Sequence, residues 1–245
     1  KHYGGQSMVA PLQTVLVRRP DAAFGAADPL LWHYTEQPYL PLAQQEHDAF
    51  VNTLLGNGVE VVYHDAQLPD HADAIFVHDP VLMTDRGAVI LRMGKSLRAG
   101  EEEAMALTLQ RLGVPILHRL SGAATAEGGD LLWLDERTLC VGLGFRTNEE
   151  GFAQLADALA GSGITLVPAP LPYFEGPEAC LHLMSLISLV DVDLAVVCRP
   201  LLPVPFYQLL VARGIELIDV PDEEFATLGT NVLALGPRHC VMLEH

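Results

Sequence analysis

Short runs of apolar residues alternate with clusters of turn-forming residues along the whole chain. Four pairs of such runs are joined by two or three polar or turn-forming residues, a pattern typical of β-hairpins. The predicted hairpins cover residues 74–91, 130–143, 185–197 and 231–243. A shorter apolar run, Val15-Leu16-Val17, precedes them and is expected to form a further strand.

Each hairpin is separated from the next by a helix-like segment and one more short strand. The helix-like segments are residues 43–56, 100–113, 149–161 and 203–213, and the strands that follow them are residues 59–63, 114–118, 164–167 and 215–220. Gly113 and Gly163 mark the ends of two of these helices, as glycines at helix C-termini do. The repeating unit is therefore ββαβ, with a period of roughly fifty residues.

A period of this length indicates radial repetition, and we predict an α/β fold that is a five-bladed α/β propeller. No G-x-G-x-x-G or Walker loop follows a strand, so a doubly wound nucleotide-binding sheet is not expected. We expect residues 1–245 to form a single catalytic domain. The fifth unit stops directly after its hairpin. Because the repeating unit also contains a helix and a further strand, a C-terminal segment is expected to complete it.

Composition narrows the class of protein. Half of the 245 residues are hydrophobic and the formal net charge is −17, without a clustered basic run, so a large core is expected and nucleic-acid binding is not. No apolar run approaches the ~18 residues of a membrane span, and no charged-then-apolar leader opens the sequence. The cysteines form no CxxC pair, so neither a metal site nor a disulfide framework is expected. We predict a cytoplasmic protein without a cofactor or a membrane partner.

An acid-then-arginine spacing occurs twice at the hairpins. Arg98 follows Asp79 by 19 positions, and Arg146 follows Glu127 by the same number. Carboxylates bind a cationic group, and guanidinium groups bind carboxylates through paired hydrogen bonds. An arginine-like ligand carries both groups. His182 occupies, in the next unit, the place of the two acids, and it can serve as general acid and base.

Each residue alone also has an ordinary explanation: a polar turn, a surface ion pair or a structural histidine. The ordered set Phe76-Val77-His78-Asp79-Pro80, Arg98, Glu127-Gly128-Gly129-Asp130, Arg146 and His182-Leu183 is nevertheless specific. It resembles the guanidino-group-modifying enzymes, whose pentein fold is a five-bladed α/β propeller. That superfamily includes arginine deiminases, amidinotransferases and dimethylarginine dimethylaminohydrolases.

The resemblance implies a role for each of these residues. Asp79 would bind the substrate guanidinium, and Glu127 would orient the catalytic His182 and contact the substrate. Arg98 and Arg146 would bind the substrate carboxylate.

Three further positions bear on the branch of the superfamily. Asp73 resembles a further substrate-contacting acid of the dimethylarginine branch, and Leu30 falls where such enzymes carry a mobile lid. Met184 stands where deiminases and amidinotransferases carry the aspartate of a His-x-Asp motif. An apolar side chain at this position removes a partner for an unsubstituted nitrogen but tolerates an alkylated one.

The nucleophile of the family is a cysteine close to the C-terminus. Cys240 lies inside the last predicted hairpin, where its neighbours alternate as in an ordinary strand. We therefore expect the nucleophilic cysteine beyond His245, with Cys240 as the alternative.

The resemblance predicts a hydrolase that converts dimethylarginine to citrulline and dimethylamine through a Cys-His covalent thiouronium mechanism. An arginine deiminase, an arginine dihydrolase, an amidinotransferase and a non-catalytic propeller that binds a partner stay as alternatives. The expected partner is a small guanidino substrate, and a homodimer is left open.

Overall fold

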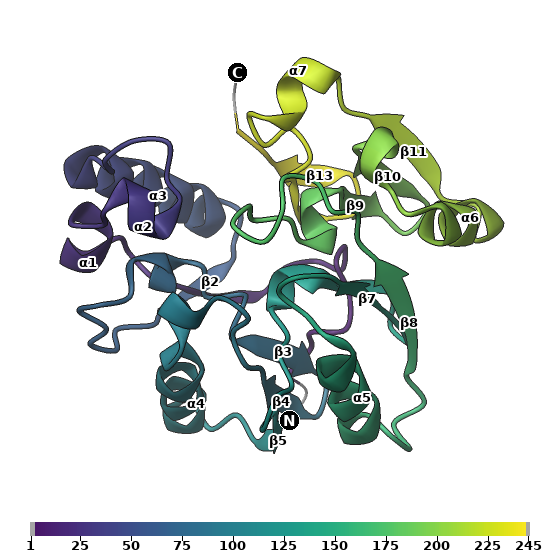
Figure 1. Cartoon of the computed structure of the whole chain (residues 1–245), viewed down its shortest axis with the longest axis horizontal. Coiled ribbons are helices and arrows are strands. Elements are labelled where there is room, and N and C mark those ends of the chain that lie inside the picture. The colour runs from purple at the N-terminus through teal and green to yellow at the C-terminus, as the bar shows by residue number, and fades with distance from the viewer. Residues whose placement is uncertain (1–2, 244–245) are drawn as a thin grey trace.

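The computed structural model describes residues 3–243 and arranges their strands in five sheets around a common centre (Figure 1). The first sheet pairs β1 (Thr14–Val17) in parallel with β2 (Glu60–Tyr63). Three three-stranded sheets follow. The second sheet contains β3 (Val81–Thr84), β4 (Gly87–Ile90) and β5 (Ile116–Arg119), and the third contains β6 (Leu131–Asp135), β7 (Thr138–Leu143) and β8 (Thr165–Pro170). The fourth contains β9 (Ile187–Asp191), β10 (Leu194–Val197) and β11 (Glu216–Asp219). Within the described residues the fifth sheet has two strands, β12 (Leu233–Gly236) and β13 (His239–Val241).

The three-stranded sheets share one connectivity. Each is a hairpin whose second strand pairs in parallel with a third strand, and a helix links the two. The linking helices are α4 (Glu101–Arg111), α5 (Glu149–Ala158) and α6 (Val204–Ala212), and α3 (Leu40–Gly56) links β1 to β2 in the same way. These helices lie at the periphery of the molecule in Figure 1, with the sheets inside them. The structure thus confirms the predicted ββαβ rhythm, which belongs to the pentein fold.

The hairpin strands begin later than predicted. Short 3₁₀ turns, η1 (Ala72–Ile75), η3 (Gly128–Asp130) and η4 (Leu183–Ser185), occupy the positions where strands were expected to start. In the first case Pro80 cannot donate to a sheet ladder, so β3 begins only after it. Glu127 and His182 directly precede η3 and η4, and Asp79 lies between η1 and β3, so all three side chains lie outside the sheets.

Several short helical elements were not predicted. α1 (Ala22–Gly25) and α2 (Pro29–Trp32) are each capped by an aspartate, because the side chains of Asp21 and Asp28 accept hydrogen bonds from backbone N–H groups. The others are α7 (Asp222–Phe225), η2 (Ser96–Arg98) and η5 (Arg199–Leu201). These elements are too short to show a helical period in the sequence.

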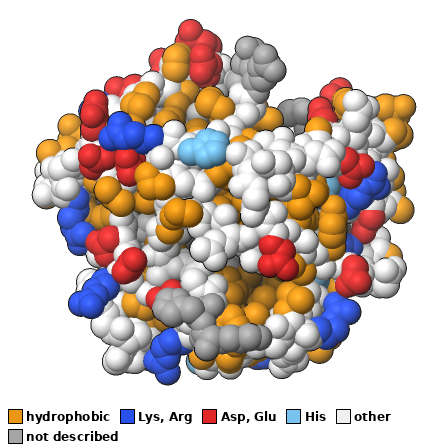
Figure 2. All heavy atoms as spheres, turned by 180° about the vertical axis from the view of Figure 1, so that it is seen from behind, with side chains coloured by type: hydrophobic (Ala, Val, Ile, Leu, Met, Phe, Trp, Pro, Cys, Tyr) orange, Lys and Arg blue, Asp and Glu red, His pale blue; other side chains and the backbone are white. Residues whose placement is uncertain are grey.

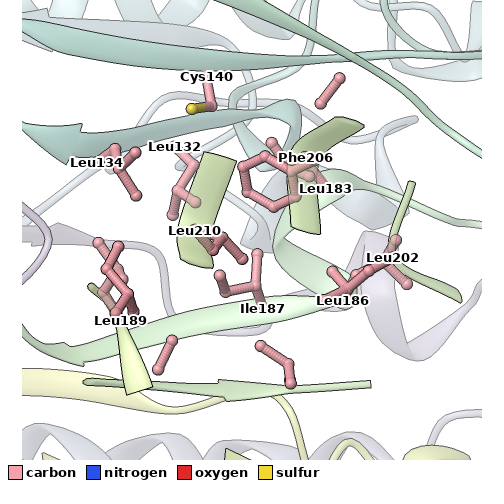
Figure 3. Packing of buried hydrophobic residues seen from close by; sticks show 14 of the residues in the cluster. Leu132, Leu134, Cys140, Leu183, Leu186, Ile187, Leu189, Leu202, Phe206 and Leu210 are labelled. Atoms are coloured by element: carbon pink, nitrogen blue, oxygen red, sulfur yellow. The ribbon is translucent and has the colours of Figure 1, made fainter. Parts of the chain in front are cut away.

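The largest core cluster joins the third and fourth units. Its side chains come from β6, β7, η4, β9 and α6, and Figure 3 shows them packed against one another: Leu132, Leu134, Cys140, Leu183, Leu186, Ile187, Leu189, Phe206 and Leu210. Fully burying such a side chain stabilises the fold by about 1.5–3 kcal/mol. Because Leu183 is a member of this cluster and fully buried, the backbone beside His182 is anchored by packing.

The N-terminal segment ties several units together. The Tyr3 hydroxyl donates to the carbonyl of Gly113, and the Gln6 amide donates to the carbonyl of Glu136. The N–H of Leu12 donates to the carbonyl of Leu235 on β12. On the face seen in Figure 2 the lysine and arginine side chains are scattered and form no contiguous basic patch. Between residues 3 and 243, no helix has both the length and the apolar character needed to cross a bilayer.

Candidate active site

Asp79, Glu127 and His182 meet at the centre of the molecule, as the sequence predicted. One carboxylate oxygen from each acid and one imidazole nitrogen lie within 4.8 Å of one another, and the residues are 7%, 1% and 8% exposed. They line a cavity of ≈ 1150 Å³ that extends to the fifth sheet. Three different units each supply one of these groups, so the site depends on how the units are placed around the centre.

Glu127 is held by three hydrogen bonds. Its Oε2 lies 2.7 Å from His182 Nε2, while its Oε1 accepts from the backbone N–H groups of Gly94 (2.9 Å) and Lys95 (3.0 Å). Burial raises the pKa of Glu127, but the hydrogen bond from His182, the charge of His182 and the hydrogen bond from the Lys95 N–H together outweigh it, and the pKa is lowered. Glu127 is therefore ionised and fixes the direction of the imidazole ring.

His182 carries a positive charge in this arrangement. Burial lowers its pKa, but hydrogen bonds with Cys180 and Glu127 and the charge of Asp79 raise the pKa well above the ordinary value. Nε2 faces Glu127, and Nδ1 lies 3.8 Å from the Cys180 Sγ. The ring is thus an imidazolium with one nitrogen bound to a carboxylate and the other near a thiol.

Two glycines allow the close approach of these groups. A Cβ on Gly129 would lie 2.5 Å from His182 Nδ1, and one on Gly128 would collide with the carbonyl oxygen of His78. A Cβ on Gly94 would lie 2.5 Å from the carbonyl oxygen of Arg146. The Gly128-Gly129 pair singled out in the sequence is therefore required by close packing rather than by a positive φ.

Asp130 holds the backbone next to His182 in place through buried hydrogen bonds, a role that was not predicted from the sequence. It is fully buried, accepts from the Thr147 hydroxyl at 2.6 Å and accepts from the N–H of Leu183 at 2.9 Å. Burial raises its pKa to about 6, against the opposing effects of His182 and its hydrogen bonds. An acid followed by an unbroken apolar strand was the signal in the sequence that could have identified it.

Asp79 and Arg98 form a buried ion pair. Arg98 Nη1 lies 2.6 Å from Asp79 Oδ2, while Nε and Nη2 donate to Glu101 and Nη2 also donates to the carbonyl of Phe76. The other oxygen of Asp79 accepts from the N–H of Gly129 at 2.9 Å. Burial raises the pKa of Asp79, but the charges of His182 and Arg98 lower it to about 2.

Arg98 was expected to bind the substrate carboxylate, but in the structure most of its N–H groups already donate to other residues of the protein. A guanidinium has five N–H groups, and the contacts with Asp79, Glu101 and Phe76 use four of them. One Nη1 hydrogen is left for a ligand, too few for a paired hydrogen bond to a carboxylate.

Arg146 is the opposite case. It is 7% exposed and lines the cavity, and its buried Nε has no hydrogen-bond partner among the described residues. A buried donor without a partner costs free energy, about 1–3 kcal/mol or more for a charged group. Arg146 is therefore suited to an anionic group that enters the cavity.

Asp73 is already paired within the protein. Lys95 Nζ and the Tyr34 hydroxyl each lie 2.6 Å from its carboxylate oxygens, and Lys95 Nζ also donates to the carbonyl of Trp32 at 3.0 Å. The Lys95 ammonium lies 4.9 Å from the centre of the Trp32 ring. Lys95 was not predicted, and nothing in the sequence around it marks it.

The remaining predicted positions divide between the cavity and the surface. Met184 lines the cavity, whereas Leu30 lies on α2, is 89% exposed and is not among the lining residues. Cys240 lies on β13, packs against the core cluster and does not line the cavity, although its neighbour Val241 does. Cys180, which was not singled out, is exposed and lines the cavity.

The three central groups are also of the types that bind metal ions. A metal would need the lone pair of His182 Nε2, but the hydrogen bond to Glu127 keeps a proton on that nitrogen. Asp79 is already paired with Arg98. The arrangement therefore favours hydrogen bonding to an organic cation over metal coordination.

Five sheet units surround a buried cluster of two carboxylates and a histidine, and the matches to known families place this arrangement among the guanidino-group-modifying enzymes of the pentein fold. The family model described as "N,N dimethylarginine dimethylhydrolase, eukaryotic" matches residues 32–243. The chain belongs to the dimethylarginine dimethylaminohydrolase family.

Known members of the superfamily are similar over most of the chain. An N(G),N(G)-dimethylarginine dimethylaminohydrolase of Streptomyces coelicolor is 30% identical over 233 residues, 95% of this chain and 82% of that protein. The structure of a cysteine-to-serine mutant of the Pseudomonas aeruginosa enzyme, complexed with citrulline, has a TM-score of 0.74 at 24% identity and covers 91% of this chain and 81% of that one. The N-terminal domain of ArgZ, a cyanobacterial arginine dihydrolase, has a TM-score of 0.76 at 18% identity, with 91% and 80% covered.

Proposed function

We propose that this protein hydrolyses the guanidinium group of a methylated arginine, giving citrulline and dimethylamine. The observation that carries the proposal is the contact between ionised Glu127 and His182 beside Asp79. Arg146 lines the same cavity, and its Nε has no partner in residues 3–243. Family membership supports the same reaction.

The charged side chains of the cavity determine how the substrate would bind. Asp79 and Glu127 are both ionised and place two negative charges where the guanidinium would bind. Arg146 binds the substrate carboxylate, and Arg98 adds at most one N–H while it mainly holds Asp79 in position. Asp73 binds the substrate ammonium group, and to do so it exchanges its contact with Lys95 for one with the ligand.

The proposed reaction has two halves. A thiolate attacks the guanidinium carbon, His182 gives its proton to the departing dimethylamine, and a covalent thiouronium remains. His182 then takes a proton from water, which attacks the same carbon. The carbon–sulfur bond breaks as the hydroxyl group becomes the carbonyl of citrulline and its proton passes to dimethylamine or to solvent, and citrulline and the thiolate are released. Because the pKa of His182 is raised, the imidazole is protonated near neutral pH and can give the proton that the first half of the reaction needs.

We propose that the nucleophilic thiol lies outside residues 3–243, in a segment that follows His245. Burial raises the pKa values of Cys140, Cys198 and Cys240, which disfavours a thiolate at these positions. Cys180 is exposed, whereas attack on a carbon held by Asp79 needs a thiol inside the buried cluster. None of the four cysteines therefore both lies inside the buried cluster and has a pKa that allows a thiolate.

The pairing of β13 supports the same proposal. The corresponding strands β4, β7 and β10 each pair with a parallel third strand that follows a helix. In residues 3–243, β13 pairs with β12. A helix and a strand after β13 would complete a fifth unit and bring their connecting residues to the cavity, completing the single catalytic domain.

Met184 distinguishes the methylated substrate from arginine. Its side chain lines the cavity two residues after His182, and an apolar wall there favours the dimethylated nitrogen over an unsubstituted one. An arginine deiminase, dihydrolase or amidinotransferase would require a polar partner at that place. A non-catalytic binding protein would not need an imidazolium beside two carboxylates.

The test measures binding and turnover separately. Calorimetry on this chain should show asymmetric dimethylarginine binding more tightly than arginine, and the protein extended through its native residues after His245 should form citrulline. His182→Gln should abolish turnover, while the exposed His239→Gln should not. Faster turnover of arginine, or near-normal turnover by His182→Gln, would contradict the proposal. A cytoplasmic location, expected from the composition, and a homodimer stay predictions, and light scattering of the purified protein tests the second.

A further inference from the structure

Cys180 differs from the other cysteines in its position. It is exposed, it lines the cavity, and its Sγ lies 3.8 Å from Nδ1 of His182. We propose that Cys180 is a reactive thiol at the edge of the cavity and a site of covalent modification by small electrophiles that carry a carboxylate.

The neighbouring imidazolium activates this thiol. Glu127 binds Nε2 of His182 at 2.7 Å and keeps the ring charged, so that Nδ1 presents an N–H donor toward the sulfur. Partly exposed cysteines beside a positively charged group are the ones that react, because the nucleophile is the thiolate. Cys180 and His182 form such a pair, and Glu127 orients the histidine.

A second observation indicates the charge of the reagent. Arg146 is 93% buried, lines the same cavity, and its Nε has no partner among the described residues. Lys95, Arg98 and His182 also line the cavity, but each of them is paired with an acid, which leaves the Arg146 Nε to bind an anion. A carboxylate-bearing electrophile would be held in the cavity before it reacts, whereas a neutral one would not.

The chemistry needs nothing beyond the reagent. With iodoacetate, the Cys180 thiolate forms a sulfur–carbon bond as the carbon–iodine bond breaks and iodide leaves, and the thiol proton goes to solvent. The product places a carboxymethyl group at the edge of the cavity. On the proposed function, this group would obstruct the entry of a methylated arginine.

The other three thiols serve as internal references. Burial raises the pKa of Cys140 to about 12 and also raises the pKa values of Cys198 and Cys240. At neutral pH these thiols should react slowly in the folded protein. Site-resolved labelling therefore measures the reactivity of Cys180 within one sample.

The experiment labels the folded full chain near pH 7 with iodoacetate and, separately, with iodoacetamide, and follows each cysteine by peptide mass spectrometry. Cys180 should react at least about tenfold faster than Cys240. The ratio of iodoacetate to iodoacetamide rates at Cys180 should exceed the ratio for the same residue in the urea-unfolded chain. His182→Gln should slow both reagents, while Arg146→Gln should slow iodoacetate only, with circular dichroism confirming that both variants fold.

Equal labelling of Cys180 and Cys240, or rates that His182→Gln leaves unchanged, would overturn the proposal. A rate ratio equal to that of the unfolded chain would overturn the preference for a carboxylate. Because labelling needs no turnover, these results are independent of whether methylated arginine is hydrolysed. Slower labelling of Cys180 in the presence of asymmetric dimethylarginine would support both proposals.

Discussion

Glu127 Oε2 and His182 Nε2 lie 2.7 Å apart although the residues are 55 positions apart in the chain. Their contact joins the third and fourth sheet units, and the same carboxylate reaches the second unit through the N–H groups of Gly94 and Lys95. One side chain thus fixes the relative position of three units and the charge of the histidine.

Replacing Glu127 by glutamine should lower the pKa of His182, because an anion at hydrogen-bond distance is lost. A smaller fraction of the protein then holds the imidazolium near pH 7, and turnover by the protein extended through its native residues after His245 should fall by ~10²–10⁴-fold. NMR titration of the His182 ring measures the first effect. The exposed Glu103→Gln is the matched control, and an unchanged titration of His182 in the Glu127 variant would contradict the assignment.

Gly129→Ala should destabilise the fold and displace His182. The new methyl group would lie 2.5 Å from Nδ1, so the ring must move, and overpacking of this kind costs about 1–3 kcal/mol. Urea unfolding measures the loss. Gly56→Ala in α3 has no atom within 4 Å and no positive φ, so it should be neutral or stabilise by up to about 1 kcal/mol. Equal stability of the two variants would show that the site tolerates the methyl group.

Arg146→Gln should weaken the binding of citrulline by at least about tenfold, because a charge-assisted hydrogen bond to the carboxylate is lost. The free energy of unfolding should change little or increase, since the variant removes a buried Nε that has no partner in the described part of the chain. Calorimetry and urea unfolding of the same sample distinguish the two effects. Arg119→Gln, at a surface ion pair with Glu103, should leave citrulline binding unchanged.

Asp130→Asn should alter how stability depends on pH. The pKa of Asp130 is raised from its ordinary value of 3.8 to about 6, so between these values the folded chain keeps a proton that the unfolded chain has lost. Its contribution to the free energy of unfolding is full below pH 3.8 and falls as pH rises toward 6, by an amount on the order of 3 kcal/mol.

The asparagine variant lacks this titration, so its Tm should fall less between pH 4 and pH 6.5 than that of the parent chain. Asp70→Asn, at an exposed carboxylate, should keep the parent's pH dependence. Parallel Tm profiles for the Asp130 variant and the parent would show that this group does not titrate in the window.

The sequence predicted the repeat and the central groups because both leave local signals. Turn residues such as Asp85-Arg86 locate the hairpins to within a few positions, and Asp79 and Glu127 stand at equivalent points of their units. It did not predict the partners of Arg98. Glu101, three residues on, is also the first residue of α4, and nothing in the sequence decides between a helix-start acid and a buried partner.

Lys95 and Cys180 were missed for a related reason. The contact of Lys95 with Asp73 spans 22 positions and depends on a loop conformation that no periodicity records. Cys180 appeared as one more thiol in an apolar stretch, and only the turn η4 shows that it lies beside the His182 ring.

The hydrogen bonds of the central cluster have a consequence for the order of folding. Glu127 with His182, Asp79 with Gly129 and Asp130 with Leu183 each join positions at least fifty residues apart. Forming contacts of such long range costs a large loop-closure entropy, whereas each hairpin can form from residues that are close in the sequence. The sheet units should therefore form before the cavity does, and a partly folded chain with native secondary structure should still lack the ability to bind a ligand.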